Sequence, residues 1–251
     1  MHNAALAQAG FADWRYQLLP VPPDLFSETV AALPAARFRG INVTIPHKRA
    51  ALALADKATA RAHAIGAANT LVFGEAGIEA DNTDAPALIG ALPLEVAGAT
   101  ALVLGAGGSA RAAAWALRDA GARAVRVWNR TPERARALGA ELGAVPVKEP
   151  GPAELLLNCT PAGLKDPARS FAELPLGEND MTKYGCVVDF VYASSETALV
   201  RAARARGIPT VTGVELLVAQ GALSFEQFTG RPAPVATMRA AAGAPLSSGA
   251  P

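Results

Sequence analysis

Short apolar runs and helical stretches alternate through the middle of the chain. Residues 100–104 form an apolar run with the length of a buried parallel strand, and a helix is predicted at 109–120, closed by Gly121. Thr131-Pro132-Glu133 has the residue types of a helix start. Further strands are predicted at 124–128, 155–158, 187–190 and 210–211. This alternation predicts a doubly wound α/β domain.

The first part of the chain mixes helix and strand patterns in a less regular order. Helices are predicted at 2–9, 24–33, 52–55, 58–65 and from Asp84, and strands at 15–21, 40–45, 70–73 and 77–80, the last two as a hairpin. We therefore expect an open α/β domain over 1–97 and a Rossmann-type domain over 98–213, with a cleft between them. A long apolar helix at 214–228 is expected to return to the first domain. That domain would be completed by 214–239, and 240–251 is predicted to be a flexible tail.

The composition narrows the class of protein without identifying it. The chain has 251 residues, 51% of them hydrophobic and 18% charged, with a formal net charge of +1. These values fit a globular protein with a real core, and the near-neutral charge argues against nucleic acid or a membrane as partner. With no signal peptide and no uninterrupted apolar run of about 18 residues, we expect a cytoplasmic protein. Cys159 and Cys186 lack metal-site spacing, so we expect buried thiols and no metal.

A glycine loop lies between the predicted strand at 100–104 and the helix that follows. It contains Gly105, Ala106, Gly107, Gly108, Ser109 and Ala110. Glycine lets the backbone turn sharply and approach a pyrophosphate, and the start of the helix offers free N–H groups with a partial positive charge. Such a string alone also fits a structural turn, but its strand–helix context favours a dinucleotide site.

The end of the second strand distinguishes between the two nicotinamide cofactors. An NAD site needs an acidic residue there to bind the ribose hydroxyls, whereas this chain has Asn129-Arg130-Thr131. Arg130 is a planar, permanently charged group suited to a phosphate. The sequence therefore predicts NADP, unless Arg130 is only a solvated surface side chain.

Two polar clusters in the first domain are candidates for chemistry. One runs from Asn42 to Lys48, and the other holds Asn69-Thr70 and is followed by an acidic stretch that ends at Asp84. A lysine beside a carboxylate can hold and donate a proton, so Lys48 and Asp84 form a possible catalytic pair. Simpler roles stay open: Lys48 as a solvated charge, and Asp84 as the N-cap of its helix.

Taken in order, these motifs resemble the shikimate dehydrogenase family over nearly the whole chain. The matching strings are Asn-Val-Thr-Ile-Pro-His-Lys ending at Lys48, Ile-Gly-Ala-Ala-Asn-Thr ending at Thr70, Asp-Asn-Thr-Asp ending at Asp84, the loop from Gly105, Asn129-Arg130-Thr131, Asn-Cys-Thr-Pro-Ala-Gly from Asn158, Asp-Phe-Val-Tyr ending at Tyr192, the stretch from Gly213 to Gln220, and Phe-Glu-Gln-Phe-Thr-Gly ending at Gly230. No single string is specific, but their order is.

The resemblance implies NADPH-dependent, reversible reduction of 3-dehydroshikimate to shikimate, a step toward chorismate and the aromatic amino acids. It implies that Lys48 and Asp84 are the catalytic pair, and that substrate is bound by Thr44, Asn69, Tyr192 and Gln220. It assigns the cofactor site to Gly105, Ala106, Gly107, Gly108, Ser109, Asn129, Arg130, Thr131, Arg134, Phe190 and Gly213. The first domain would then hold the substrate and the second the cofactor.

One departure and two alternatives accompany this interpretation. The family has a strand and a Ser-x-Ser-Pro segment before the residues that match Met1-His2-Asn3, so we expect either a start assigned too late or a shorter chain. A quinate/shikimate dehydrogenase of broader specificity and a non-catalytic NADP-binding protein are the alternatives. Arg130 argues against the first, and the presence of both Lys48 and Asp84 argues against the second. A homodimer also stays open.

Overall fold

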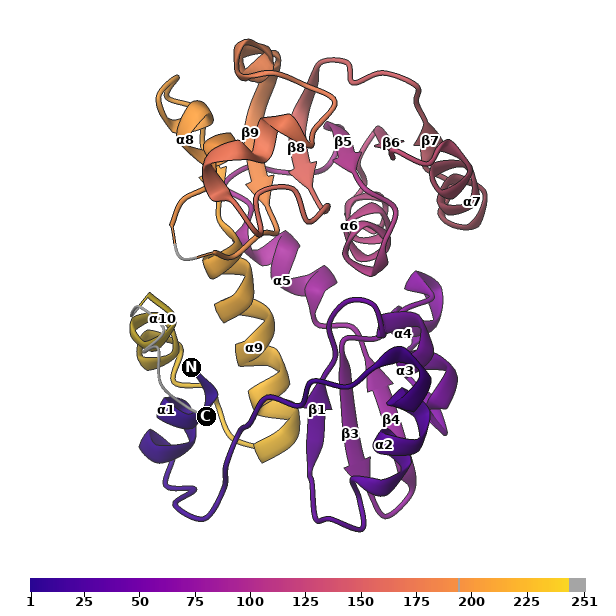
Figure 1. Cartoon of the computed structure of the whole chain (residues 1–251), viewed down its shortest axis with the longest axis vertical. Coiled ribbons are helices and arrows are strands. Elements are labelled where there is room, and N and C mark those ends of the chain that lie inside the picture. The colour runs from indigo at the N-terminus through magenta and orange to yellow at the C-terminus, as the bar shows by residue number, and fades with distance from the viewer. Residues whose placement is uncertain (194, 244–251) are drawn as a thin grey trace.

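A computed structural model describes residues 1–193 and 195–243 of the chain. Two separate β-sheets lie at opposite ends of the molecule, each accompanied by helices, and two helices connect them (Figure 1). This arrangement confirms the predicted fold class, an α/β chain with a Rossmann-type part.

The smaller sheet belongs to the first part of the chain. Its strand order is β1-β3-β4-β2, formed by β1 (Gly40–Asn42), β2 (Lys57–Ala58), β3 (Thr70–Gly74) and β4 (Gly77–Asp81). The predicted hairpin is present, with Gly74 opposite Gly77. Helices α2 (Phe26–Ala32), α3 (Lys48–Leu54) and α4 (Ala60–Ile65) accompany it, and a single 3₁₀ turn (Pro23–Leu25) leads into α2. Phe26, Val30, Ala51 and Leu71 form its buried core.

The larger sheet is parallel throughout, with strand order β10-β9-β8-β5-β6-β7. Its strands are β5 (Thr100–Leu104), β6 (Ala124–Trp128), β7 (Val145–Pro146), β8 (Ala153–Asn158), β9 (Tyr184–Asp189) and β10 (Thr210–Val211). Helices α6 (Gly108–Asp119), α7 (Pro132–Leu142) and α8 (Ala198–Arg204), with 3₁₀ segments at Pro167–Ala172 and Glu178–Lys183, make the connections. The order reverses between β5 and β8, and ligands of such sheets bind at the carboxyl ends of the strands at this reversal.

Helices α5 (Asp84–Ala91) and α9 (Gly213–Thr229) run between the two sheets (Figure 1). Side chains of α9 reach the first sheet: Gln227 donates to Asp81 at 2.7 Å, and Ser224 donates to Asn42 at 3.3 Å. The chain therefore returns to its first part after the Rossmann sheet. Helices α1 (His2–Gln8) and α10 (Val235–Gly243) pack on α9 and on each other, around Leu6, Phe225 and Met238.

The structure corrects several predicted elements. The strand predicted at 40–45 is only Gly40–Asn42, and the helix predicted at 52–55 is the end of α3. Residue 58, where a helix was predicted to begin, lies in β2. Residues 15–21 form no strand; the backbone N–H and C=O of Tyr16 are paired instead with the side-chain amide of Asn3. Residues 240–243, predicted as part of the tail, complete helix α10 instead, and residues 244–251 lie outside the described residues. The segment predicted to divide the domains, 94–97, lies in the connection between α5 and β5.

Candidate active site

Lys48 and Asp84 form a buried ion pair. Lys48 begins α3 and Asp84 begins α5, and the Lys48 Nζ atom lies 2.7 Å from Oδ2 of Asp84. Their side chains are 9% and 10% exposed, so Lys48 is not a solvated surface charge. Thr83, not Asp84, is the N-cap of α5. The carboxylate of Asp84 is therefore available to the lysine.

Asn69 holds the second oxygen of the Asp84 carboxylate. Its Nδ2 atom donates to Asp84 Oδ1 at 2.8 Å, and its Oδ1 atom accepts from the Thr83 backbone N–H at 2.8 Å. The Thr70 hydroxyl also donates to Asn69 Oδ1 at 3.1 Å. Asn69, just before β3, thereby fixes the orientation of Asp84 at the start of α5.

Of the other residues predicted to bind substrate, only Gln220 makes a direct contact with this cluster. Gln220, on α9, lies beside Asn69. The Nδ2 atom of Asn69 donates to the Oε1 atom of Gln220 at 3.4 Å. Thr44 is exposed in the turn before α3, and Tyr192 is 49% exposed in the loop between β9 and α8. Lys48, Asp84, Asn69 and Gln220 are thus connected directly, whereas Thr44 and Tyr192 present exposed side chains.

The glycine loop joins β5 to α6 at the reversal of strand order. Gly105 has a φ of +110°, a conformation that favours glycine, and a Cβ there would lie 3.1 Å from the Cys159 carbonyl oxygen. A Cβ on Gly107, the N-cap of α6, would have no neighbour within 4 Å. Gly107 thus leaves open space in front of the start of a helix, as a bound phosphate requires.

The next two residues of the loop, Gly108 and Ser109, lie against Lys48, the predicted catalytic lysine. Lys48 Nζ donates to the Ser109 hydroxyl at 3.1 Å. A Cβ on Gly108 would lie only 2.8 Å from Cδ of Lys48. The predicted cofactor loop and the predicted catalytic lysine are therefore in direct contact.

The remaining predicted cofactor residues lie at or beyond the carboxyl ends of the large sheet. Asn129, after β6, donates to the Thr131 carbonyl at 2.9 Å, and the side chains of Arg130 and Arg134 are exposed. The last of the set are Ala106 and Phe190, which pack on the Rossmann core, and Gly213 at the start of α9. A Cβ on Gly213 would lie 2.2 Å from the Val191 carbonyl oxygen, so glycine here allows close packing against the β9–α8 loop.

Two residues that the sequence analysis missed, Tyr16 and Ser224, extend the cluster away from Lys48 through Asn42. Asn42 Oδ1 accepts from Tyr16 at 3.0 Å and from Ser224 at 3.3 Å. Burial, and then the phenol of Tyr192, raise the pKa of Tyr16 to about 12. Ser224 lies one helical turn after Gln220, and this spacing, which places both on the same face of α9, was readable from the sequence. Tyr16 lies in an irregular segment and had no such signal.

Buried titratable groups lie along β9 and just after β8. Burial raises the pKa of Asp189 to about 6, although Thr197, Val191 N and Asn158 all donate to its carboxyl group. Burial also raises the pKa of the Cys159 thiol and that of Cys186, to about 11 for the latter. Both cysteines are free and buried, as predicted, and their raised pKa values favour the protonated thiol at neutral pH.

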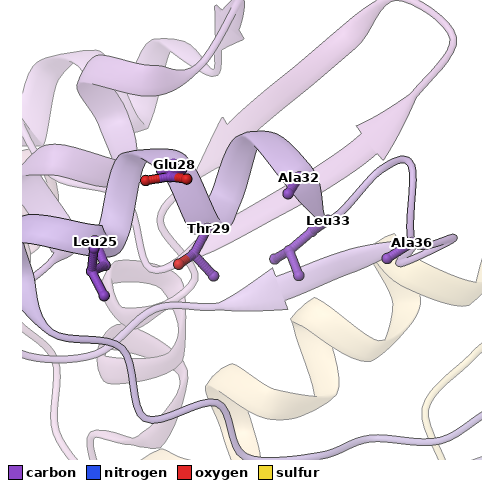
Figure 2. A pocket seen from close by; sticks show the side chains of 6 residues that line it. All are labelled: Leu25, Glu28, Thr29, Ala32, Leu33 and Ala36. Carbon is purple, nitrogen blue, oxygen red and sulfur yellow. The ribbon is translucent and has the colours of Figure 1, made fainter.

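Other features of the described residues lie away from this cluster. A pocket on α2 is lined by side chains that include Leu25, Glu28 and Leu33, none of them a predicted site residue (Figure 2). No three His, Cys, Asp or Glu side chains gather as a metal site within 1–193 and 195–243. In the same ranges, no helix has the length and apolar character needed to cross a membrane.

The fold and the site define a two-domain α/β oxidoreductase with a dinucleotide loop beside a lysine–aspartate pair. Family models agree along the chain: the shikimate dehydrogenase substrate binding domain matches residues 1–71, shikimate / quinate 5-dehydrogenase matches 90–154, and the shikimate 5'-dehydrogenase C-terminal domain matches 213–242.

Individual relatives give the same result. The chain is 46% identical to the shikimate dehydrogenase (NADP(+)) of Methylobacterium radiotolerans, over 86% of this chain and 80% of that protein. A crystal structure of shikimate 5-dehydrogenase from Thermus thermophilus, in complex with NADP(H) and shikimate, matches with a TM-score of 0.84 and 39% identity, covering 96% and 91% of the two chains. The 5-ketofructose reductase of a Gluconobacter strain also matches, with a TM-score of 0.82 and 30% identity over 96% and 90%. The chain belongs to the shikimate dehydrogenase family, as its motifs predicted.

Proposed function

We propose that this protein catalyses the reversible, NADPH-dependent reduction of 3-dehydroshikimate to shikimate. The observation that supports this most strongly is the buried Lys48–Asp84 ion pair, held against the dinucleotide loop through Ser109. The names of relatives at 39–46% identity, shikimate dehydrogenase (NADP(+)), agree with this reaction and with the cofactor.

The residues present fit a phosphorylated dinucleotide. Gly107 leaves open space at the start of the 12-residue helix α6, where N–H groups can bind a pyrophosphate. Arg130, two residues beyond β6, is exposed and well placed in the sequence for the additional phosphate of NADP. When bound, NADPH supplies the hydride for the reduction.

The protein's side chains then position the substrate and supply the proton that the keto oxygen gains on reduction. The Lys48 ammonium donates a proton to the oxygen of the reacting keto group and stabilises the negative charge that develops there. It has three N–H donors, and its bonds to Asp84 and Ser109 use two of them. Asp84 keeps the ammonium in place, and Asn69 keeps Asp84 in place. Asn69, Gln220 and the exposed side chains of Thr44 and Tyr192 bind the hydroxyl and carboxylate groups of the substrate.

A spectrophotometric assay with the purified protein tests this proposal. We expect 3-dehydroshikimate to oxidise NADPH, and shikimate to reduce NADP in the reverse direction, with NADH and NAD far less effective. Binding of NADP without any turnover would contradict the proposal and favour the non-catalytic alternative.

Substrate range is the point on which the alternatives differ. One matching family model covers shikimate and quinate dehydrogenases together, and a structural neighbour is named as a 5-ketofructose reductase. We infer a preference for shikimate because the relatives at higher identity carry that name. Comparable kcat/KM values for quinate and shikimate would instead favour the broader enzyme.

We further propose the domain roles and setting predicted from the sequence. Residues 1–97 with 214–239 would bind substrate and supply the catalytic pair, and 98–213 would bind NADP. The free, buried thiols of Cys159 and Cys186 favour a reducing compartment such as the cytoplasm. Whether the enzyme is a homodimer stays a prediction, which analytical ultracentrifugation tests.

A further inference from the structure

Two neighbouring glycines of the dinucleotide loop have different surroundings. A Cβ on Gly107 would meet nothing within 4 Å, whereas a Cβ on Gly108 would lie 2.8 Å from Cδ and 3.0 Å from Cβ of Lys48. Neither glycine has the left-handed φ that only glycine tolerates well. The absence of a side chain at Gly108 therefore makes room for the lysine, and at Gly107 it leaves room for a ligand.

Ser109 adds a polar contact at the same place. Its hydroxyl accepts a 3.1 Å hydrogen bond from Lys48 Nζ, in a site where the lysine side chain is only 9% exposed. Asp84 accepts from the same ammonium at 2.7 Å. Lys48 comes from the first domain and Ser109 from the start of α6 in the second. The ammonium is thus held from both sides of the domain boundary.

We propose that Gly108 and Ser109 are positioning residues for Lys48. Through them, the loop that binds the cofactor also fixes the position of the Lys48 ammonium, the proton donor. Because Gly108 has no side chain, the aliphatic part of the Lys48 side chain can pass beside it. The Ser109 hydroxyl accepts one N–H of the Lys48 ammonium, so that another N–H faces the keto oxygen of the substrate. The kinetic test of this inference depends on the proposed function, because it measures kcat for that reaction. The contact between Lys48 and Ser109 can be measured without substrate or cofactor.

Kinetics separate a positioning role from a cofactor-binding role. Ser109→Ala removes a hydrogen bond to a charged group, so we expect kcat to fall about tenfold. The Kd for NADP, measured by fluorescence titration, is expected to change less than about threefold. Ser109→Thr keeps a hydroxyl and is expected to restore most of kcat. The solvent deuterium isotope effect on kcat is expected to rise in Ser109→Ala, because proton transfer becomes slower.

The two glycines provide a matched pair of variants. Gly108→Ala is expected to lower kcat while leaving the Kd for NADP close to that of the wild type, and Gly107→Ala is expected to raise that Kd. If Gly108→Ala and Ser109→Ala raise the Kd for NADP and leave kcat at saturating cofactor unchanged, the loop serves only the cofactor and the proposal is wrong.

A spectroscopic test does not depend on turnover. In cofactor-free protein with heavy-nitrogen-labelled lysines, a buried and hydrogen-bonded Lys48 ammonium is expected to give its own signal, assigned by its loss in Lys48→Met. In Ser109→Ala this signal is expected to shift and its protons to exchange faster with water. An unchanged signal would overturn the inference. An enzyme inactive on 3-dehydroshikimate with the expected signal change would instead refute the proposed function alone.

Discussion

Asn69 donates a 2.8 Å hydrogen bond to Oδ1 of Asp84, the carboxylate oxygen that Lys48 does not use. Asp84 therefore has one partner for each oxygen, and both partners come from the first domain. Because Asn69 also accepts from the Thr83 backbone N–H, it links the Asn69-Thr70 motif to the N-cap of α5.

Replacing Asn69 should impair both catalysis and stability. In Asn69→Ala, Asp84 loses a hydrogen bond to a charged group, and the substrate loses a polar contact. We expect kcat/KM for 3-dehydroshikimate to fall about 10- to 100-fold and the free energy of unfolding to fall by about 1–3 kcal/mol. Steady-state kinetics and urea unfolding measure these two effects. A variant with wild-type kinetics would remove Asn69 from the site.

Arg130 should determine the choice of cofactor. In Arg130→Ala, the additional phosphate of NADP loses a charged partner that NAD never needs. The ratio of kcat/KM with NADP to that with NAD should then fall about 10- to 100-fold. Arg136→Ala is the matched control, because Arg136 is an exposed arginine on α7 that pairs with Glu133. A ratio that falls equally in both variants would mean that Arg130 has no specific role.

Asp189 should make stability fall as pH rises from about 4 to about 6. Its folded pKa of about 6 lies above the ordinary value of 3.8, so the folded state binds more protons in this range. The expected loss is about 3 kcal/mol, complete once pH exceeds the folded value.

The Asp189→Asn variant isolates this effect. Asparagine cannot ionise, so the difference in unfolding free energy between variant and wild type should move in favour of the variant as pH rises across the same range. Urea unfolding at several pH values measures it. If the unfolding free energies of the wild type and of Asp189→Asn change with pH in parallel, Asp189 does not titrate as proposed.

Asp81 should have the opposite pH dependence. Burial alone would raise its pKa, but hydrogen bonds from Thr59, Arg61 and the Asn82 N–H, with the charge of Arg61, lower it below the ordinary value. Its contribution to stability is therefore full above the unfolded pKa and is lost as pH falls through the folded one. Asp81→Asn should cost about 2–4 kcal/mol at neutral pH and progressively less in acid. A penalty independent of pH would contradict this assignment.

Most regular elements of the second domain were predicted from the sequence, although β7 and α8 were not. Strands β5 and β6 have the predicted limits, 100–104 and 124–128. A parallel strand buried on both faces gives an unbroken apolar run, which is the pattern of β5. Strand β6 contains Arg126 and alternates between buried and half-buried positions. Residues 15–21 have a strand-like composition but form no strand, since strand formation depends on a neighbour that composition does not report.

The same limit applies to the site. The motifs identified Lys48 and Asp84 as a pair, and their 2.7 Å contact agrees with the pairing. The motifs did not reveal that Gly108 and Ser109 face Lys48, because a glycine loop looks the same whether it approaches a phosphate or a side chain. Contacts between domains depend on tertiary packing, which no local pattern encodes.

A double-mutant cycle on Lys48 and Asp84 tests most directly whether this ion pair acts in catalysis. We expect Lys48→Met alone to lower kcat for 3-dehydroshikimate reduction by about 100-fold or more, with a smaller effect on KM. If Asp84 acts chiefly through Lys48, adding Asp84→Asn to Lys48→Met should cost little more. Full additivity of the two losses, or a Lys48→Met enzyme with wild-type kcat, would contradict the central claim that this ion pair performs the proton chemistry.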